Sequence, residues 1–290
     1  MVVAIIIVFC LSMVYSCKMK HQETGDTIIV SIAPLKYIVE KITCGDFNVE
    51  VLLPEGASPE TYSPTPRQIA NVENSAFLFT TGLMDFENEL VSKVDKSLID
   101  RSNKIVSLSK GITLLSGTCS HSHEEGHSHS HGIDPHVWTS PEQLKVIALN
   151  TYNAISYEYP DSVKYAVAYR QLDKEIETLS EWVKTTLKAS GVERFIIYHP
   201  ALAYYAHDYG LEQIAVENEG KEPSAVHMKG IIDEAREAGI TSVMYQKEFP
   251  RSVVEPIARE LNAVIIEVNP LSEDIFSELR MITNVITGNF

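Results

Sequence analysis

Basic residues are scarce in this sequence, and their scarcity excludes a large class of functions. The chain of 290 residues carries 24 Lys and Arg against 39 Asp and Glu, a formal net charge of −15. A nucleic-acid surface needs clustered Lys and Arg, so we expect no nucleic acid among the partners. The hydrophobic content of 44% is ordinary for a globular protein. The acidity suits a protein that attracts small cations.

The sequence also lacks the motifs of several enzyme classes. No predicted helix carries a His-Glu-x-x-His pair, and the chain has neither a Gly-x-Ser-x-Gly nucleophile elbow nor a glycine-rich phosphate loop. No internal repeat is precise enough for a solenoid. These absences favour a binding protein over an enzyme.

The apolar run at the N-terminus, Val2–Tyr15, is too short to span a bilayer of ~30 Å as a helix. It fits the core of a signal peptide, although no basic residue precedes it. Ser16 and Cys17 then follow, which resembles a bacterial lipoprotein signal whose Cys becomes the lipidated N-terminus. We therefore predict a signal at 1–17, a tether at 18–26 and an extracytoplasmic protein anchored to the membrane on the periplasmic side. The alternative is a buried first strand with an incidental Cys.

Cysteine is rare, with four in the chain. Cys10 would leave with the signal, and Cys17 would be acylated. Cys44 and Cys119 remain, and in an oxidising compartment they could pair or stay as two free thiols. Cys119 precedes a histidine-rich run and could also help to hold a metal.

Strand patterns alternate with helix patterns in both halves of the chain, which predicts parallel βαβ units. The expected strands are 27–33, 47–53, 76–80, 105–108, 194–198, 212–216, 242–245 and 264–268. The expected helices are 35–43, 66–74, 86–94, 141–159, 201–209, 224–238, 253–261 and 275–286.

A longer helix is predicted between the two halves. Residues 161–189 contain no Gly or Pro, and Gly191 fits a helix terminus. At 1.5 Å per residue this helix would be about 40 Å long. Its apolar residues fall at steps of three and four: Leu172, Ile176, Leu179, Val183 and Leu187.

These patterns predict an α/β fold with two parallel-sheet βα lobes, joined by one long rigid helix and separated by a cleft. The N-terminal lobe would cover 27–159, the linking helix 160–190 and the C-terminal lobe 191–290. Ligands in open α/β sheets tend to bind at the carboxyl ends of the strands. We therefore expect the binding site in the cleft.

Half of the ten histidines gather in one polar run within a predicted loop at 119–132. Imidazole suits Zn, Cu and Ni, and a run without apolar residues cannot bury itself. Because ordering such a loop costs entropy, it should bind metal weakly, as an auxiliary site for scavenging or sensing. A fortuitous polar loop is the alternative. The five residues are His121, His123, His127, His129 and His131.

A tight metal site needs ligands held by rigid elements, and two other histidines meet this condition. His136 lies in the segment Asp134-Pro135-His136-Val137-Trp138, just before a predicted helix. His199 ends the predicted strand 194–198. Both would lie at the mouth of the predicted cleft.

Several motifs resemble those of the metal-specific solute-binding proteins of ABC transporters, in particular the zinc-binding branch. They are GASPETY at 56–62, TGL at 81–83, DPHVW at 134–138 beside the histidine-rich loop, HPA at 199–201 and NPL at 269–271. The resemblance extends from Ile28 to the C-terminus. It implies two lobes bridged by one helix, a metal in the cleft and a membrane permease as the partner.

The resemblance also implies a ligand set: Glu60, His136, His199 and Asn269. The family usually has His where this chain has Glu60, and Asp where it has Asn269. Glu60 is a competent zinc ligand, but a neutral amide oxygen is a poorer one. Water or another carboxylate is therefore the alternative at the fourth position, with Glu267, Glu217 and Glu222 as candidates.

The predicted function is capture of zinc (Zn2+) outside the cytoplasm and its delivery to an ABC transporter permease. One carboxylate with two histidines also suits Mn or Fe, so a manganese- or iron-binding transporter component is an alternative. A zinc-dependent hydrolase is another, because three ligands leave a position for water. A surface adhesin that uses metal only for stability is a third. The histidine-rich loop favours zinc.

Overall fold

A computed structural model describes residues 27–94, 104–117, 132–217 and 224–290. The predicted signal, the tether, Cys17, Cys119, Glu222 and the five histidines of the predicted loop lie outside these residues. Cys44 lies within them as an exposed free thiol. No helix in these four ranges is both long enough and apolar enough to cross a membrane.

The N-terminal lobe is built on a four-stranded parallel sheet with the order β2-β1-β3-β4. Its strands are β1 (Thr27–Val30), β2 (Asn48–Val51), β3 (Phe77–Thr80) and β4 (Ile105–Ser107). The helices that follow the first three strands are α1 (Ala33–Thr43), α2 (Pro66–Asn74) and α3 (Asp85–Lys93). The first strand ends three residues earlier than predicted, because Pro34 takes the first turn of α1, where a missing N–H is tolerated.

The C-terminal lobe has the same strand order, β6-β5-β7-β8, and is also all parallel. Its strands are β5 (Arg194–Ile197), β6 (Glu212–Ala215), β7 (Ser242–Gln246) and β8 (Val264–Val268). Its helices are α7 (Ala203–Tyr209), α8 (Ala225–Glu237), α9 (Glu255–Leu261) and α10 (Ile275–Ile286), with a short 3-10 turn η2 (Arg251–Val253). In such a sheet the topological switch point lies between β5 and β7, where ligands are expected.

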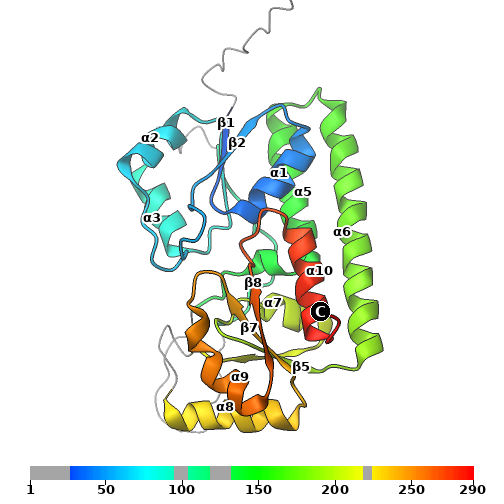
Figure 1. Cartoon of the computed structure of the whole chain (residues 1–290). Helices are drawn as coiled ribbons and strands as arrows, with labels where there is room; N and C mark the ends of the chain where they lie inside the picture. Colours follow the sequence, from blue (N-terminus) through cyan, green and yellow to red (C-terminus); the bar gives the residue numbers. More distant parts are fainter. Residues whose placement is uncertain (1–26, 95–103, 118–131, 218–223) are drawn as a thin grey trace, which may run out of the picture.

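One long helix connects the lobes. The 3-10 turn η1 (Val137–Thr139) leads into α5 (Pro141–Glu158), and α6 (Val163–Ser190) then runs alongside both lobes (Figure 1). The helix α6 buries all five apolar residues that the sequence pattern assigned to one face. It packs on α1 and α5 and, further along, on α10.

The hydrophobic core does not stop at the boundary between the lobes. One buried cluster contains residues of the first lobe such as Ile28 and Phe79 together with Phe195 and Leu279 of the second. A smaller cluster, including Ile196 and Val243, belongs to the C-terminal lobe alone. The predicted architecture of two α/β lobes and one long helix is confirmed, and the two lobes share apolar packing.

Candidate metal centre

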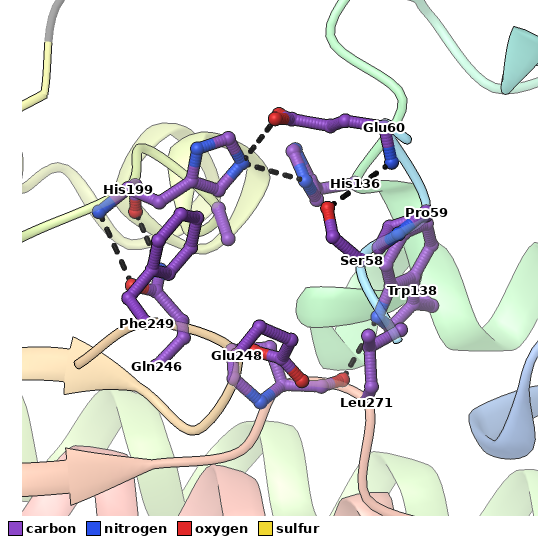
Figure 2. A pocket seen from close by; sticks show the side chains of 12 residues that line it. Ser58, Pro59, Glu60, His136, Trp138, His199, Gln246, Glu248, Phe249 and Leu271 are labelled. Atoms are coloured by element: carbon purple, nitrogen blue, oxygen red, sulfur yellow. Dashed lines mark hydrogen bonds and ion pairs between the residues drawn. The ribbon is translucent and has the colours of Figure 1, made fainter. Parts of the chain in front are cut away.

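The structure brings Glu60, His136 and His199 together between the lobes. The Nε2 atoms of His136 and His199 face each other at 3.4 Å, and a Glu60 carboxylate oxygen lies 3.2 Å from His199 Nε2 (Figure 2). Glu60 and His136 come from the N-terminal lobe and His199 from the C-terminal lobe. Ligand atoms from widely separated segments therefore converge on one point.

The position of His199 follows from the end of β5. Beyond this strand the backbone N–H of His199 donates to Gln246 Oε1 at 3.1 Å, and Gln246 Nε2 donates to the His199 carbonyl at 2.6 Å. Gln246 ends the neighbouring strand β7 and is 2% exposed. The ring of Phe249 stacks on the imidazole at 5.7 Å. His199 is thus held at the switch point of the second sheet.

His136 is oriented by a residue two positions before it. Asp134 Oδ1 accepts both from the backbone N–H of His136 at 2.8 Å and from its Nδ1 at 2.9 Å. The indole of Trp138 then donates to the Pro270 carbonyl at 2.9 Å, which ties this segment to the other lobe. Asp134 and His136 are both buried.

Each histidine has a buried carboxylate behind it. Glu217, two residues beyond β6, lies 2.9 Å from His199 Nδ1, as Asp134 does from His136 Nδ1. In a neutral imidazole this contact places the proton on Nδ1, so the Nε2 lone pair is free to bind a metal. Both rings therefore present their Nε2 atoms to the shared space.

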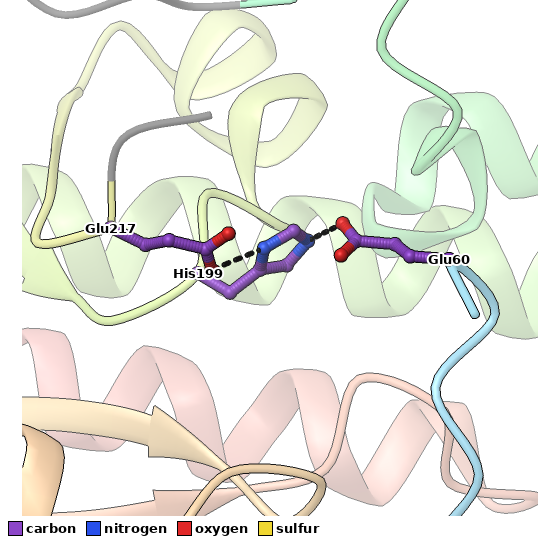
Figure 3. Close-up of side chains that lie close together, drawn as sticks. All are labelled: Glu60, His199 and Glu217. Carbon is purple, nitrogen blue, oxygen red and sulfur yellow. Dashed lines mark hydrogen bonds and ion pairs between the residues drawn. The ribbon is translucent and has the colours of Figure 1, made fainter. Parts of the chain in front are cut away.

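Glu60, His199 and Glu217 have ligand atoms within 4.8 Å of one another. Figure 3 shows, however, that Glu217 and Glu60 approach opposite ends of the imidazole of His199. An ion at Nε2 is on the side of Glu60, with the ring between it and Glu217. Glu217 is thus placed to orient the ring, and Glu60 is on the side where a bound ion would lie.

The electrostatics of the cluster favour a positive charge on or near His199. Burial by itself would lower the pKa of His199, but the hydrogen bond to Glu217 and the charges of Glu60, Glu217 and Asp134 raise it above the ordinary value. These groups would stabilise a bound dication in the same way. A proton and a metal ion thus compete for this site.

The two separations from His199 Nε2 match those that a tetrahedral zinc ion requires. Bonds of ~2.0 to 2.1 Å at tetrahedral angles place ligand atoms about 3.3 Å apart. The observed separations are 3.4 Å between the two Nε2 atoms and 3.2 Å from His199 Nε2 to Glu60. The cavity around them has a volume of about 30 Å³, which leaves room for about one water beside the three side chains.

Asn269 lies elsewhere. It lines an adjoining cavity, whereas Pro270 and Leu271 line that of the histidines. Its Oδ1 accepts the Leu271 N–H at 3.2 Å, and its own N–H donates to Glu278 at 2.7 Å. Asn269 as the fourth ligand stays a prediction.

The alternatives named for the fourth position also differ in their surroundings. Glu267 is exposed, and its carboxylate accepts from the Tyr245 hydroxyl at 2.9 Å. Glu217 is buried behind His199.

Sequence reasoning missed the orienting roles of Asp134, Glu217 and Gln246. A partial signal existed, because Glu217 and Gln246 fall at the ends of strands that flank β5.

The fold and the site together define a class: a two-lobed α/β protein with a candidate metal site of two histidines and a carboxylate between its lobes. The chain matches the family described as "ZnuA: Zinc-uptake complex component A periplasmic" over residues 28–286. It belongs to that family.

Known relatives agree with this assignment. The chain is 28% identical over 288 residues to the high-affinity zinc uptake system protein ZnuA of Bacillus subtilis (strain 168), covering 92% of this chain and 87% of that protein. It is 26% identical to the zinc-binding lipoprotein AdcA of Streptococcus pneumoniae R6, covering 90% of this chain but only 53% of AdcA. A solved crystal structure of ZnuA superposes with a TM-score of 0.80 at 32% identity, covering 91% of this chain and 98% of the other.

Proposed function

We propose that this protein captures zinc outside the cytoplasm and delivers it to the permease of an ABC transporter. The observation that carries the proposal is the pair of Nε2 atoms, 3.4 Å apart and from different lobes, with the Glu60 carboxylate beside them. Membership of the zinc-uptake family supports zinc as the cargo.

The geometry supports a cycle of binding and release without chemistry on the ion. Asp134 and Glu217 hold the two imidazoles with their lone pairs directed inward, which raises the basicity of the ligands. Glu60 adds a negative charge from an exposed side chain, 46% accessible against 12% for His199. Withdrawal of Glu60 would therefore weaken the site without breaking the apolar packing between the lobes.

That the chain performs no catalysis is part of this proposal, and a zinc hydrolase is not favoured. Residues His123 to His127 do spell His-Glu-x-x-His. In hydrolases that motif acts from one face of a helix. Here it contains Gly126, sits in a polar run and lies outside the described residues.

The membrane anchor is a further part of the proposal. An apolar run followed by Ser16-Cys17 supports a signal at 1–17 with lipidation at Cys17, and one relative is named a lipoprotein. The boundaries of the lobes at 27–159, 160–190 and 191–290, and the auxiliary histidine-rich loop at 119–132, are proposed on the same terms.

Calorimetric titration of the metal-free protein with zinc and with manganese tests the proposal. We expect one tight zinc site, much weaker manganese binding, and loss of the tight site in His136→Ala and His199→Ala. Deletion of residues 121–131 should remove only weaker additional binding. Near-wild-type zinc affinity in both histidine variants would refute the site, and a preference for manganese would support the alternative cargo.

A further inference from the structure

A second, larger cavity opens beside the metal cavity. It has a volume of about 360 Å³ and is lined by residues of both lobes, among them Glu55 and Lys247. Glu248 and Leu271 line this cavity and the metal cavity alike. These two side chains thus form the partition between the wider space and the histidine cluster.

The charged side chains of the wider cavity are neutralised with one exception. Glu55 pairs with Lys247 across the lobes at 2.6 Å, and Glu273 pairs with Lys36 across the lobes at 2.9 Å. Glu248 makes no ion pair or hydrogen bond to another side chain in the described parts of the chain. It is the carboxylate on the partition, and it carries the charge that the other groups leave uncompensated.

Glu248 is held close to the His199 side of the metal cavity. It is half-buried and follows β7, between Gln246, which holds the His199 backbone, and Phe249, which stacks on the ring. Burial raises the pKa of its carboxyl, and a hydrogen bond from its own backbone N–H and the charges of His199 and Lys247 offset this only in part. Figure 2 shows Glu248 on the side of the cavity opposite Glu60.

This placement separates Glu248 from the final ligand set. The contacts drawn in Figure 2 join Glu60 and His136 to His199, whereas none of them reaches Glu248. An ion on its way from the wider cavity would meet it first.

We propose that Glu248 is a staging carboxylate, which attracts the dication from the wider cavity and passes it to Glu60, His136 and His199. The inference rests on the proposed function and adds the route by which the metal enters. Carboxylates bind divalent cations and exchange them readily, and an unpaired one in a partly buried cavity focuses their approach. The charge acts over about 8 to 10 Å at moderate ionic strength.

Stopped-flow zinc capture at low ionic strength tests the role with three variants. Glu248→Gln keeps the size and removes the charge, and we expect association about three- to tenfold slower. The dissociation rate, measured by transfer to a chelator, should fall with it, so that the equilibrium affinity changes less. Glu248→Asp keeps the charge and should stay near the wild type. Glu237→Gln is the matched control, because Glu237 is an exposed carboxylate on α8 that lines neither cavity.

The outcomes separate this inference from the proposed function. Slower association in Glu248→Gln alone, with the difference shrinking in about 0.5 M salt, supports staging. Association equal to that of Glu237→Gln overturns it. So does a loss of affinity that arises only from faster dissociation, because Glu248 would then be an ordinary ligand. If the wild type bound no zinc, or bound it independently of His199, the proposed function itself would fail.

Discussion

The two sides of the candidate metal centre are built in different ways. On the C-terminal side, Glu217, Gln246 and Phe249 hold His199 from three directions, and only 12% of its side chain is exposed. On the other side, Glu60 sits in the loop between β2 and α2 with 46% of its side chain exposed, and its carboxylate contacts only His199 in the described residues. We expect the less exposed histidine to supply affinity, and the exposed carboxylate to be the ligand that can be withdrawn.

The largest effect should come from removing His199. If zinc binding of about 10 to 16 kcal/mol is shared over four ligands, His199→Ala should weaken affinity about 100- to 1,000-fold. Competition with a chromogenic chelator measures this loss. A change of less than tenfold would show that His199 does not dominate its side of the site.

The carboxylate behind the ring should come next. Loss of an orienting partner typically lowers metal affinity about 10- to 100-fold, and we expect Glu217→Gln to fall in this range. Glu212→Gln is a suitable control, because Glu212 lies at the exposed start of β6, the strand that precedes Glu217. Equal affinities in the two variants would contradict the orienting role of Glu217.

Proton competition should be the third effect. The pKa of His199 in the folded protein is raised above its value of about 6.5 in the unfolded chain. Protonation of His199 therefore stabilises the metal-free protein fully below pH 6.5, and this stabilisation is lost as the pH rises through the raised pKa. Zinc affinity should change in the opposite sense and fall about tenfold per pH unit as the pH drops below the folded-state pKa of His199. Denaturant unfolding with and without zinc, between pH 6 and 8, would show opposite slopes. Parallel slopes would refute the competition.

The exposed ligand should give the smallest effect. Glu60→Gln removes the charge on the withdrawable side, where water can replace the lost oxygen, so we expect affinity to drop by about tenfold or less. The loss should appear as faster release, measured by stopped-flow transfer to a chelator. A loss as large as that of His199→Ala would remove the distinction between the two sides.

Much of the fold could be predicted from the sequence, because its signals are local. Strand 194–198 is apolar and short, and the face of α6 follows the helical period, so β5 and α6 appear close to where the patterns placed them. His199 could be nominated because it follows a buried strand. The 3.4 Å separation between the Nε2 atoms of His199 and His136 could not be predicted, because it depends on how the two lobes pack.

Roles that depend on tertiary neighbours could not be predicted from the sequence. The resemblance suggested Asn269 as a ligand, but nothing local indicated that its Oδ1 would accept a backbone N–H at 3.2 Å. Glu248 gave no signal at all, since its interest comes from the two cavities that share it. Paired and unpaired carboxylates look alike in a sequence with 39 acidic residues.

The apolar core that continues from one lobe into the other has a consequence for the transporter. With α6 running beside both lobes and packing on α1 and α10, the outline of the protein should differ little between its loaded and empty forms. We therefore expect any difference that a permease reads to lie at the mouth of the cleft, where the loop of Glu60 and the ion pair between Glu55 and Lys247 are exposed.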